Sequence, residues 1–213
     1  MGVVLQLSDV RLSFPKLEMP DYFKPGVQSR PGEKRRWSSA FHITPGRSTA
    51  QRVVGGKLSG DKGDAKKMID DAMIEVAKEK FEKKWQLEYD NLITDPKACA
   101  WQNGARKEMA GVWILGTHRY ESDGRPIVID GDKSPIYKPN GEIYPEKMGR
   151  LYSGMYVNAQ VEIWAQGAPN KGLRGGLLII QRLKDGDAFS GGAAPQLDTM
   201  GEVEDGADAE DMS

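Results

Sequence analysis

Basic and aromatic side chains recur together along this sequence, close to the ends of predicted strands and in the loops between them. Aromatic rings offer flat surfaces on which the rings of a ligand can stack, and lysine and arginine neutralise phosphate groups. A surface that joins both features suits a ligand that is anionic and carries flat rings, as a single-stranded nucleic acid does. The candidate residues are Lys16, Arg35, Arg36, Trp37, Arg106, Lys107, Arg119, Tyr120, Arg150, Tyr152, Tyr156, Trp164, Lys171 and Arg174.

Some of these rings have a second interpretation as core residues. Trp37 shares one face of a predicted strand with Phe41 and Ile43, which favours burial over stacking on a ligand. Other rings lie on a polar face or at a strand end, where stacking on a ligand and simple edge packing both stay open. They are Tyr152, Tyr156 and Trp164.

Residues that could support catalysis are few. The histidines and the cysteine lack the spacing of zinc ligands, and they are His42, His118 and Cys99. A magnesium-dependent nuclease would have to use Asp130, Asp132 and Glu142, although a turn explains these carboxylates more simply. The sequence also has no GxxxxGK[ST] phosphate-binding loop. We therefore expect a protein without catalytic activity, metal or cofactor.

The elements that must position the candidate residues are mainly strands. Period-two alternation and β-branched residues predict strands over 3–14 (ended by Pro15), 35–43, 112–120, 125–129, 151–166 and 173–183. A helix is predicted from an N-cap at Asp64 to about Trp85, because apolar residues recur there every three or four positions. Residues 55–63 are expected to form a flexible link and 101–107 an exposed turn, while Trp85 and Trp113 are expected in the core.

About five strands with one long helix between them indicate a mainly β fold of the α+β class. We expect an OB-fold, with a five-stranded, partly open barrel.

Charge is divided unevenly along the chain. All 30 basic residues and 22 of the 31 acidic residues lie in 1–184, which gives this part a formal charge of +8. Residues 185–213 hold nine acidic residues and no basic ones. The sequence therefore predicts a basic domain over 1–184, with an anionic partner, and a disordered acidic tail over 185–213.

The absence of three sequence features predicts where in the cell the protein is found. One cysteine allows no internal disulfide, which fits a reducing compartment. No apolar run approaches the roughly 20 residues needed to span a bilayer, and the N-terminus has no secretory signal. We expect a cytoplasmic protein without membrane contact.

Several motifs resemble a family of phage single-stranded-DNA-binding proteins, over roughly residues 8 to 192. They are Arg11-Leu-Ser-Phe-Pro15, Arg125-Pro-Ile-Val-Ile-Asp130, Leu151-Tyr-Ser-Gly-Met-Tyr-Val-Asn158, Asn170-Lys-Gly172 and the stretch 176–192. The resemblance implies an OB-fold that coats single strands during phage DNA replication and recombination in the host cytoplasm. It also implies a tail that contacts replication proteins. Many such tails end in an aromatic residue or Pro-Phe, whereas this one ends Asp211-Met-Ser213.

In an OB-fold the binding face consists of the middle strands with the first-to-second and fourth-to-fifth loops. Lys16, Lys24, Arg30, Lys34 and Arg35 are expected in the first of these loops, and Lys171 and Arg174 in the second. The expected function is stoichiometric, sequence-independent binding of single-stranded DNA, with self-association on DNA as a further expectation. The alternatives are a strand-annealing mediator, the nuclease, and a virion or scaffold protein.

Overall fold

The computed structural model describes residues 2–29, 31–104 and 110–189. Two of the candidate residues, Arg106 and Lys107, lie outside this part, as do the loop residue Arg30 and most of the acidic tail. The strands are β1 (Val3–Asp21), β2 (Arg36–Ile43), β3 (Thr49–Val54), β4 (Lys57–Asp64), β5 (Trp101–Asn103), β6 (Trp113–Tyr120), β7 (Ile127–Ile129), β8 (Tyr156–Gln166) and β9 (Gly172–Lys184), and the helices are α1 (Ala65–Phe81) and α2 (Trp85–Ile93).

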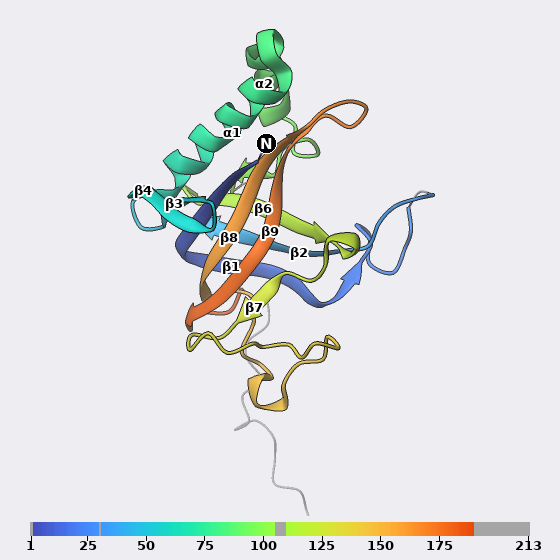
Figure 1. Cartoon of the computed structure of the whole chain (residues 1–213), viewed down its shortest axis with the longest axis vertical. Helices are drawn as coiled ribbons and strands as arrows, with labels where there is room; N and C mark the ends of the chain where they lie inside the picture. The colour runs from blue at the N-terminus through green and yellow to red at the C-terminus, as the bar shows by residue number, and fades with distance from the viewer. Residues whose placement is uncertain (1, 30, 105–109, 190–213) are drawn as a thin grey trace, which may run out of the picture.

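Five strands close into a barrel in the order β1–β2–β6–β9–β8 and back to β1 (Figure 1). All neighbours are antiparallel except β6 and β9, which run parallel and share a single register pair, His118 with Gly176. The expected OB-fold with one long helix is confirmed. The barrel is closed on every side. Pairing is weakest between β6 and β9, and this boundary is called the β6–β9 seam below.

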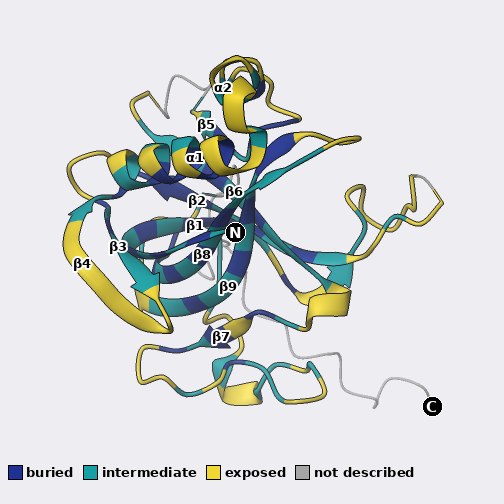
Figure 2. Ribbon diagram, turned by 45° about the horizontal axis from the view of Figure 1, so that its top comes forward, coloured by how far each residue is buried: buried dark blue, intermediate teal, exposed yellow. Residues whose placement is uncertain are grey.

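Alternation along the strands fills the barrel interior as predicted. On β8, Val157, Val161 and Ile163 are fully buried, and on β2 the inward positions include Phe41 and Ile43. Figure 2 shows α1 lying against the barrel with buried residues on one face and exposed residues on the other.

The N-terminus of α1 is capped as the sequence predicts. Oδ1 of Asp64 accepts a hydrogen bond from the Lys67 amide at 3.0 Å. The helix ends at Phe81 rather than Trp85, because Glu82 adopts a left-handed φ of 48°. Trp85 therefore starts a second helix, α2, and is only half-buried.

Three other local predictions were wrong. Pro15 does not end β1, because it falls at a register shift between Ser13 and Lys16, where no ladder hydrogen bond is needed from its nitrogen. The glycine-rich segment 55–63 is not a flexible link. It forms the turn and second strand of the β3–β4 hairpin, and the positive φ angles of Gly55 and Gly56 make this tight turn.

The segment expected as an exposed turn begins instead with a core residue. Trp101 is 1% exposed, and its ring lies 5.0 Å from that of Trp113, which is half-buried. Its indole nitrogen donates to Oδ1 of Asp70 on α1 at 2.7 Å. Pairing of β5 with β6, a contact that local pattern does not reveal, carries Trp101 inward.

Residues 185–189, which the sequence pattern assigns to the acidic tail, contact the residues that precede β8. The Phe189 amide donates to the Ser153 carbonyl at 2.9 Å, and the Tyr152 hydroxyl donates to the Gly186 carbonyl at 3.0 Å. Residues 185–189 thus lie on the barrel, while 190–213 are outside the described residues. No helix in the described ranges is long and apolar enough to cross a membrane.

Candidate nucleic-acid interface

A groove of about 740 Å³ runs over the outer face of β2 and β6. Inward burial of Trp37, Ser39 and Phe41 turns the alternate residues of β2 outward, because side chains alternate along a strand. The same alternation on β6 turns Gly116, His118 and Tyr120 outward. Residues from several strands and loops line the groove, among them Phe14, Lys16, Phe23, Arg36, Ser38, Ala40, Gly116, His118, Tyr120 and Arg174.

Small residues form the floor of this groove, and exposed phenylalanines stand at its side. Ser38, Ala40 and Gly116 leave the strand surface low enough for a flat ring to lie against it. Phe14 and Phe23 are 72% and 71% exposed, which is unusual for phenylalanine. Phe14 projects outward because it has a positive φ of 45° at the register shift of β1.

Two arginines bring positive charge to the groove. The Arg36 guanidinium lies 4.9 Å from the centre of the Phe23 ring, and burial lowers the pKa of this arginine. Arg174 is held by two neutral acceptors, the Lys97 carbonyl at 3.1 Å and the Gln166 side chain at 3.3 Å. These contacts fix the guanidinium without cancelling its charge, so it can pair with a phosphate.

His118 is an uncharged ring at neutral pH. Burial, with the nearby cations Arg36 and Arg174, lowers its pKa to about 4, against a smaller opposing effect of Asp123. Its imidazole lies edge-on to Tyr120, with the ring centres 5.0 Å apart. The pair therefore presents two aromatic groups to the groove.

This pKa makes the fold sensitive to mild acid. The unfolded chain takes up the His118 proton below about pH 6.5 while the native protein resists it until about pH 4, so stability is lost as the pH falls between these values. We expect urea unfolding of the wild type to lose about 1–2 kcal/mol more than His118→Gln between pH 7 and pH 5. Equal losses in the two proteins would contradict this assignment.

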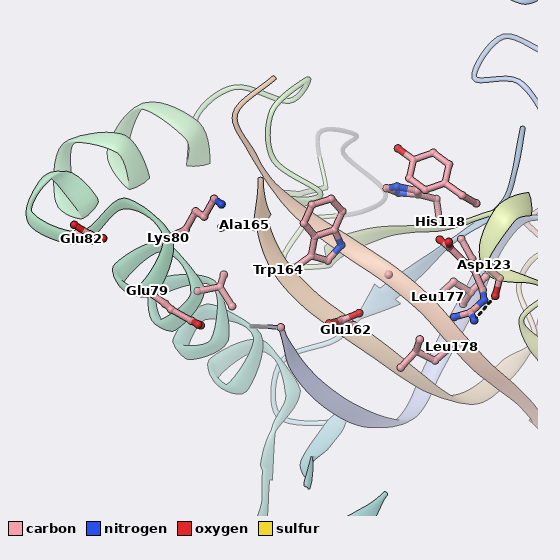
Figure 3. Close-up of a pocket in the computed structure, with 15 residues that line it drawn as sticks. Glu79, Lys80, Glu82, His118, Asp123, Glu162, Trp164, Ala165, Leu177 and Leu178 are labelled. Atoms are coloured by element: carbon pink, nitrogen blue, oxygen red, sulfur yellow. Dashed lines mark hydrogen bonds between the residues drawn. The ribbon is translucent and has the colours of Figure 1, made fainter. Parts of the chain in front are cut away.

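A second cleft continues the groove across the β6–β9 seam (Figure 3), sharing His118 and Tyr120 with it. Its floor is Gly176 of β9, whose missing side chain leaves space between β6 and β8. Trp164 projects into it between the C-terminal end of α1 and His118. The carboxylates of Glu79, Glu82, Asp123 and Glu162 also line this cleft, so it suits phosphate less well than the groove does.

The fold brings together some of the residues predicted from sequence. Lys16, Arg36, Tyr120 and Arg174 line the groove, with Lys16 placed there by the longer β1 rather than by a loop. Trp164 and Arg119 line the adjoining cleft, where Arg119 donates to the carbonyls of Asp123 and Gly124 and so shapes the turn after β6.

Other predicted residues lie away from the groove. Trp37 is 6% exposed and belongs to the inner face, so the core interpretation holds for it. Arg35 forms a bidentate salt bridge with Glu121, and Lys171 pairs with Glu88 of α2. The remaining candidates are exposed or half-buried residues in or next to the segment that contacts 185–189, and they are Arg150, Tyr152 and Tyr156.

Sequence reasoning missed Phe14, Phe23 and His118. Phe14 ends the predicted strand 3–14 and Phe23 falls between predicted strands, and the positive φ of Phe14 at a bulge cannot be seen in the local pattern. Sequence reasoning weighs His118 only as a metal ligand or catalytic group. Alternation along 112–120 puts it on the same face as Tyr120, but its place in the groove depends on the pairing of β6 with β2.

The carboxylates considered for a nuclease each have a partner. Lys147 binds Asp130 at 2.8 Å, Ser134 donates to Asp132, and Lys138 pairs with Glu142. Among the described residues no group of three His, Cys, Asp or Glu side chains could hold a metal ion.

An OB barrel with a cationic, aromatic groove over its second and third strands defines a class of proteins that bind single-stranded nucleic acid. Residues 3–212 match the family described as "Enterobacter phage Enc34, ssDNA-binding protein", so the chain belongs to this family.

A curated relative, putative protein p50 of Acyrthosiphon pisum secondary endosymbiont phage 1, is 28% identical over 203 residues and 93% of both chains. The structure of the single-stranded DNA-binding protein from bacteriophage Enc34 in complex with ssDNA has a similar fold. It gives a TM-score of 0.60 at 20% identity, over 88% of this chain and 89% of that one. Another structure of the single-stranded DNA-binding protein from bacteriophage Enc34 gives a TM-score of 0.59 at 21% identity, over 90% of this chain and 86% of that one.

Proposed function

We propose that this protein binds single-stranded DNA without sequence preference, along the groove over β2 and β6, and coats it during phage DNA replication and recombination. The observation that carries the proposal is the groove itself. In this member of the family, the groove combines cations with exposed rings on the face where OB-folds bind single strands.

In this proposal Arg36, Arg174 and Lys16 neutralise phosphates, while Phe14, Phe23 and Tyr120 supply surfaces for bases. Stacking contributes about 1–3 kcal/mol per base and tolerates any base, since every base has a flat face. The uncharged polar side chains best placed to read base edges are Ser38, Gln166 and Asn170. The cations and apolar rings of the lining outnumber them, which fits binding without sequence preference. The protein acts stoichiometrically in the host cytoplasm, without catalysis or a cofactor.

Titration with oligo(dT) tests this function. We expect quenching of tryptophan fluorescence, because Trp164 lines the cleft that adjoins the groove. Affinity should fall steeply between about 50 and 200 mM salt, because bound phosphates release counterions. Binding that is absent, or indifferent to salt, would contradict the proposal. Annealing of added complementary strands would favour the alternative of a recombination mediator.

The acidic tail is proposed to compete weakly with DNA for the cations of the groove and to recruit basic replication proteins. The stretch from Asp198 to Asp211 holds seven acidic residues, counting both ends. Closely spaced carboxylates resemble a phosphate backbone in charge. We expect a variant that lacks 193–213 to bind oligo(dT) more tightly at low salt, by severalfold, with the gain disappearing at high salt. Equal affinity at low salt would exclude the competition and leave recruitment as the role of the tail.

A further inference from the structure

Three cations surround one tyrosine ring near the start of β8. The charged groups of Arg11, Arg47 and Lys184 lie 5.5, 4.6 and 4.8 Å from the centre of the Tyr156 ring. They come from β1, the turn after β2 and the end of β9. Asp9 pairs with both Arg47 and Lys184, at 3.2 Å in each case. One carboxylate shared between two of three cations leaves this cluster positive.

A ring from the C-terminal segment already occupies a slot beside these cations. Phe189 stacks on His42, with the ring centres 4.6 Å apart and the planes 26° from parallel. The Arg11 guanidinium also lies against the Phe189 ring, 4.2 Å from its centre. The space between the His42 imidazole and the Arg11 guanidinium is therefore wide enough to hold one flat ring.

His42 belongs to the same outer face as the groove. On β2 the outward positions Arg36, Ser38 and Ala40 line the groove, and His42 is the next outward position. Alternation alone would leave this imidazole exposed, yet it is only 9% exposed, because Phe189 covers it. Two residues along a strand span about 7 Å, so the slot begins close to where the groove ends.

The register of the strands shows that the surface around His42 extends across β1 to β8. β1 pairs Arg11 with His42 on one side and with Tyr156 on the other. The three side chains thus stand in one row across β2, β1 and β8. A strand of DNA that leaves the groove past Ala40 meets the slot first and the cations around Tyr156 next.

We propose that this row is a second nucleotide-binding subsite, which takes a base between His42 and Arg11 and the adjoining phosphate between Arg47 and Lys184. The ligand is the continuation of the single strand bound in the groove, so the subsite rests on the proposed function. In the absence of DNA the Phe189 ring occupies the position of this base, and a single strand long enough to reach the subsite displaces it. The phosphate competes with Asp9 for its two cations.

The length of the oligonucleotide separates this subsite from the groove. OB-folds engage about 4–16 nucleotides, so oligo(dT) of about 6 nucleotides should fill only the groove and one of about 20 should reach both sites. For the double variant Arg47→Gln/Lys184→Gln we expect affinity for the long oligonucleotide to fall about tenfold at low salt. Its salt slope should drop by about 0.7, since one phosphate contact is lost. Affinity for the short one should stay within about twofold.

Arg52→Gln is the matched control, because Arg52 is an exposed arginine that pairs with Glu75 of α1, away from this row. Loss of affinity that is equal for both lengths, or no loss for the long one, would overturn the subsite. Failure of the proposed function looks different, since the wild type would then bind neither length in a salt-dependent way.

A separate experiment tests whether Phe189 occupies the position of the base. Phe189→Ala removes the ring that DNA must displace, so affinity for the long oligonucleotide should rise severalfold while that for the short one is unchanged. Photo-crosslinking with 5-iodouracil placed along the long strand should label the peptide that contains His42 or Tyr156. An unchanged affinity for the long strand, or labels confined to the groove, would overturn the assignment.

Discussion

Replacing Arg36 and Arg174 together by glutamine should weaken binding of oligo(dT) by about 10- to 100-fold at low salt. Each guanidinium lines the groove, where Arg36 lies against a phenylalanine ring and Arg174 is held by neutral oxygens. Loss of two phosphate contacts should also reduce the slope of log affinity against log salt by about 1.4. Fluorescence titration at several salt concentrations measures both quantities.

The neighbouring residue gives a matched control for this experiment. Arg35 is adjacent in sequence and carries the same charge, but its guanidinium forms a bidentate pair with Glu121 and does not line the groove. Arg35→Gln should therefore change affinity by less than about threefold. If Arg35→Gln and Arg36→Gln weakened binding equally, net charge rather than the groove would be responsible.

Trp101→Ala should destabilise the fold by about 3–5 kcal/mol, the usual cost of truncating a buried tryptophan. The indole fills the space between α1 and the β5–β6 pair, where it contacts Trp113 and donates to Asp70. Truncation would leave a cavity and remove a hydrogen bond from a half-buried carboxylate. Urea unfolding followed by circular dichroism measures the loss.

Trp164→Ala is the comparison variant, because Trp164 lines the cleft beside the groove whereas Trp101 lies in the core. Trp164 is half-buried at the edge of the cleft beside the groove, so its truncation should cost about 1 kcal/mol or less in stability. An equally small effect for Trp101→Ala would mean that Trp101 lies in an exposed turn, as local sequence pattern predicts.

Local pattern could predict the frame of this protein because the relevant signals span only a few residues. Alternation identified the inward faces of β2 and β8, and the spacing of apolar residues with Asp64 identified α1. The motifs shared with phage single-stranded-DNA-binding proteins indicated the family, and the matched family confirms it. Period-two alternation also explains why Arg35, Arg36 and Trp37 cannot all contact one ligand, since neighbours on a strand face opposite sides.

The sequence by itself determines the division of charge between residues 1–184 and the acidic stretch that follows, and it predicts most of the strands and the long helix. Which cations and rings share a surface was decided only by closure of the barrel, because β6, β2, β1 and β8 are brought together by pairings between distant segments. The bulge that turns Phe14 outward, the burial of Trp101 and the cover of Phe189 over His42 have the same origin. Each depends on a long-range contact, which spacing along the chain does not encode.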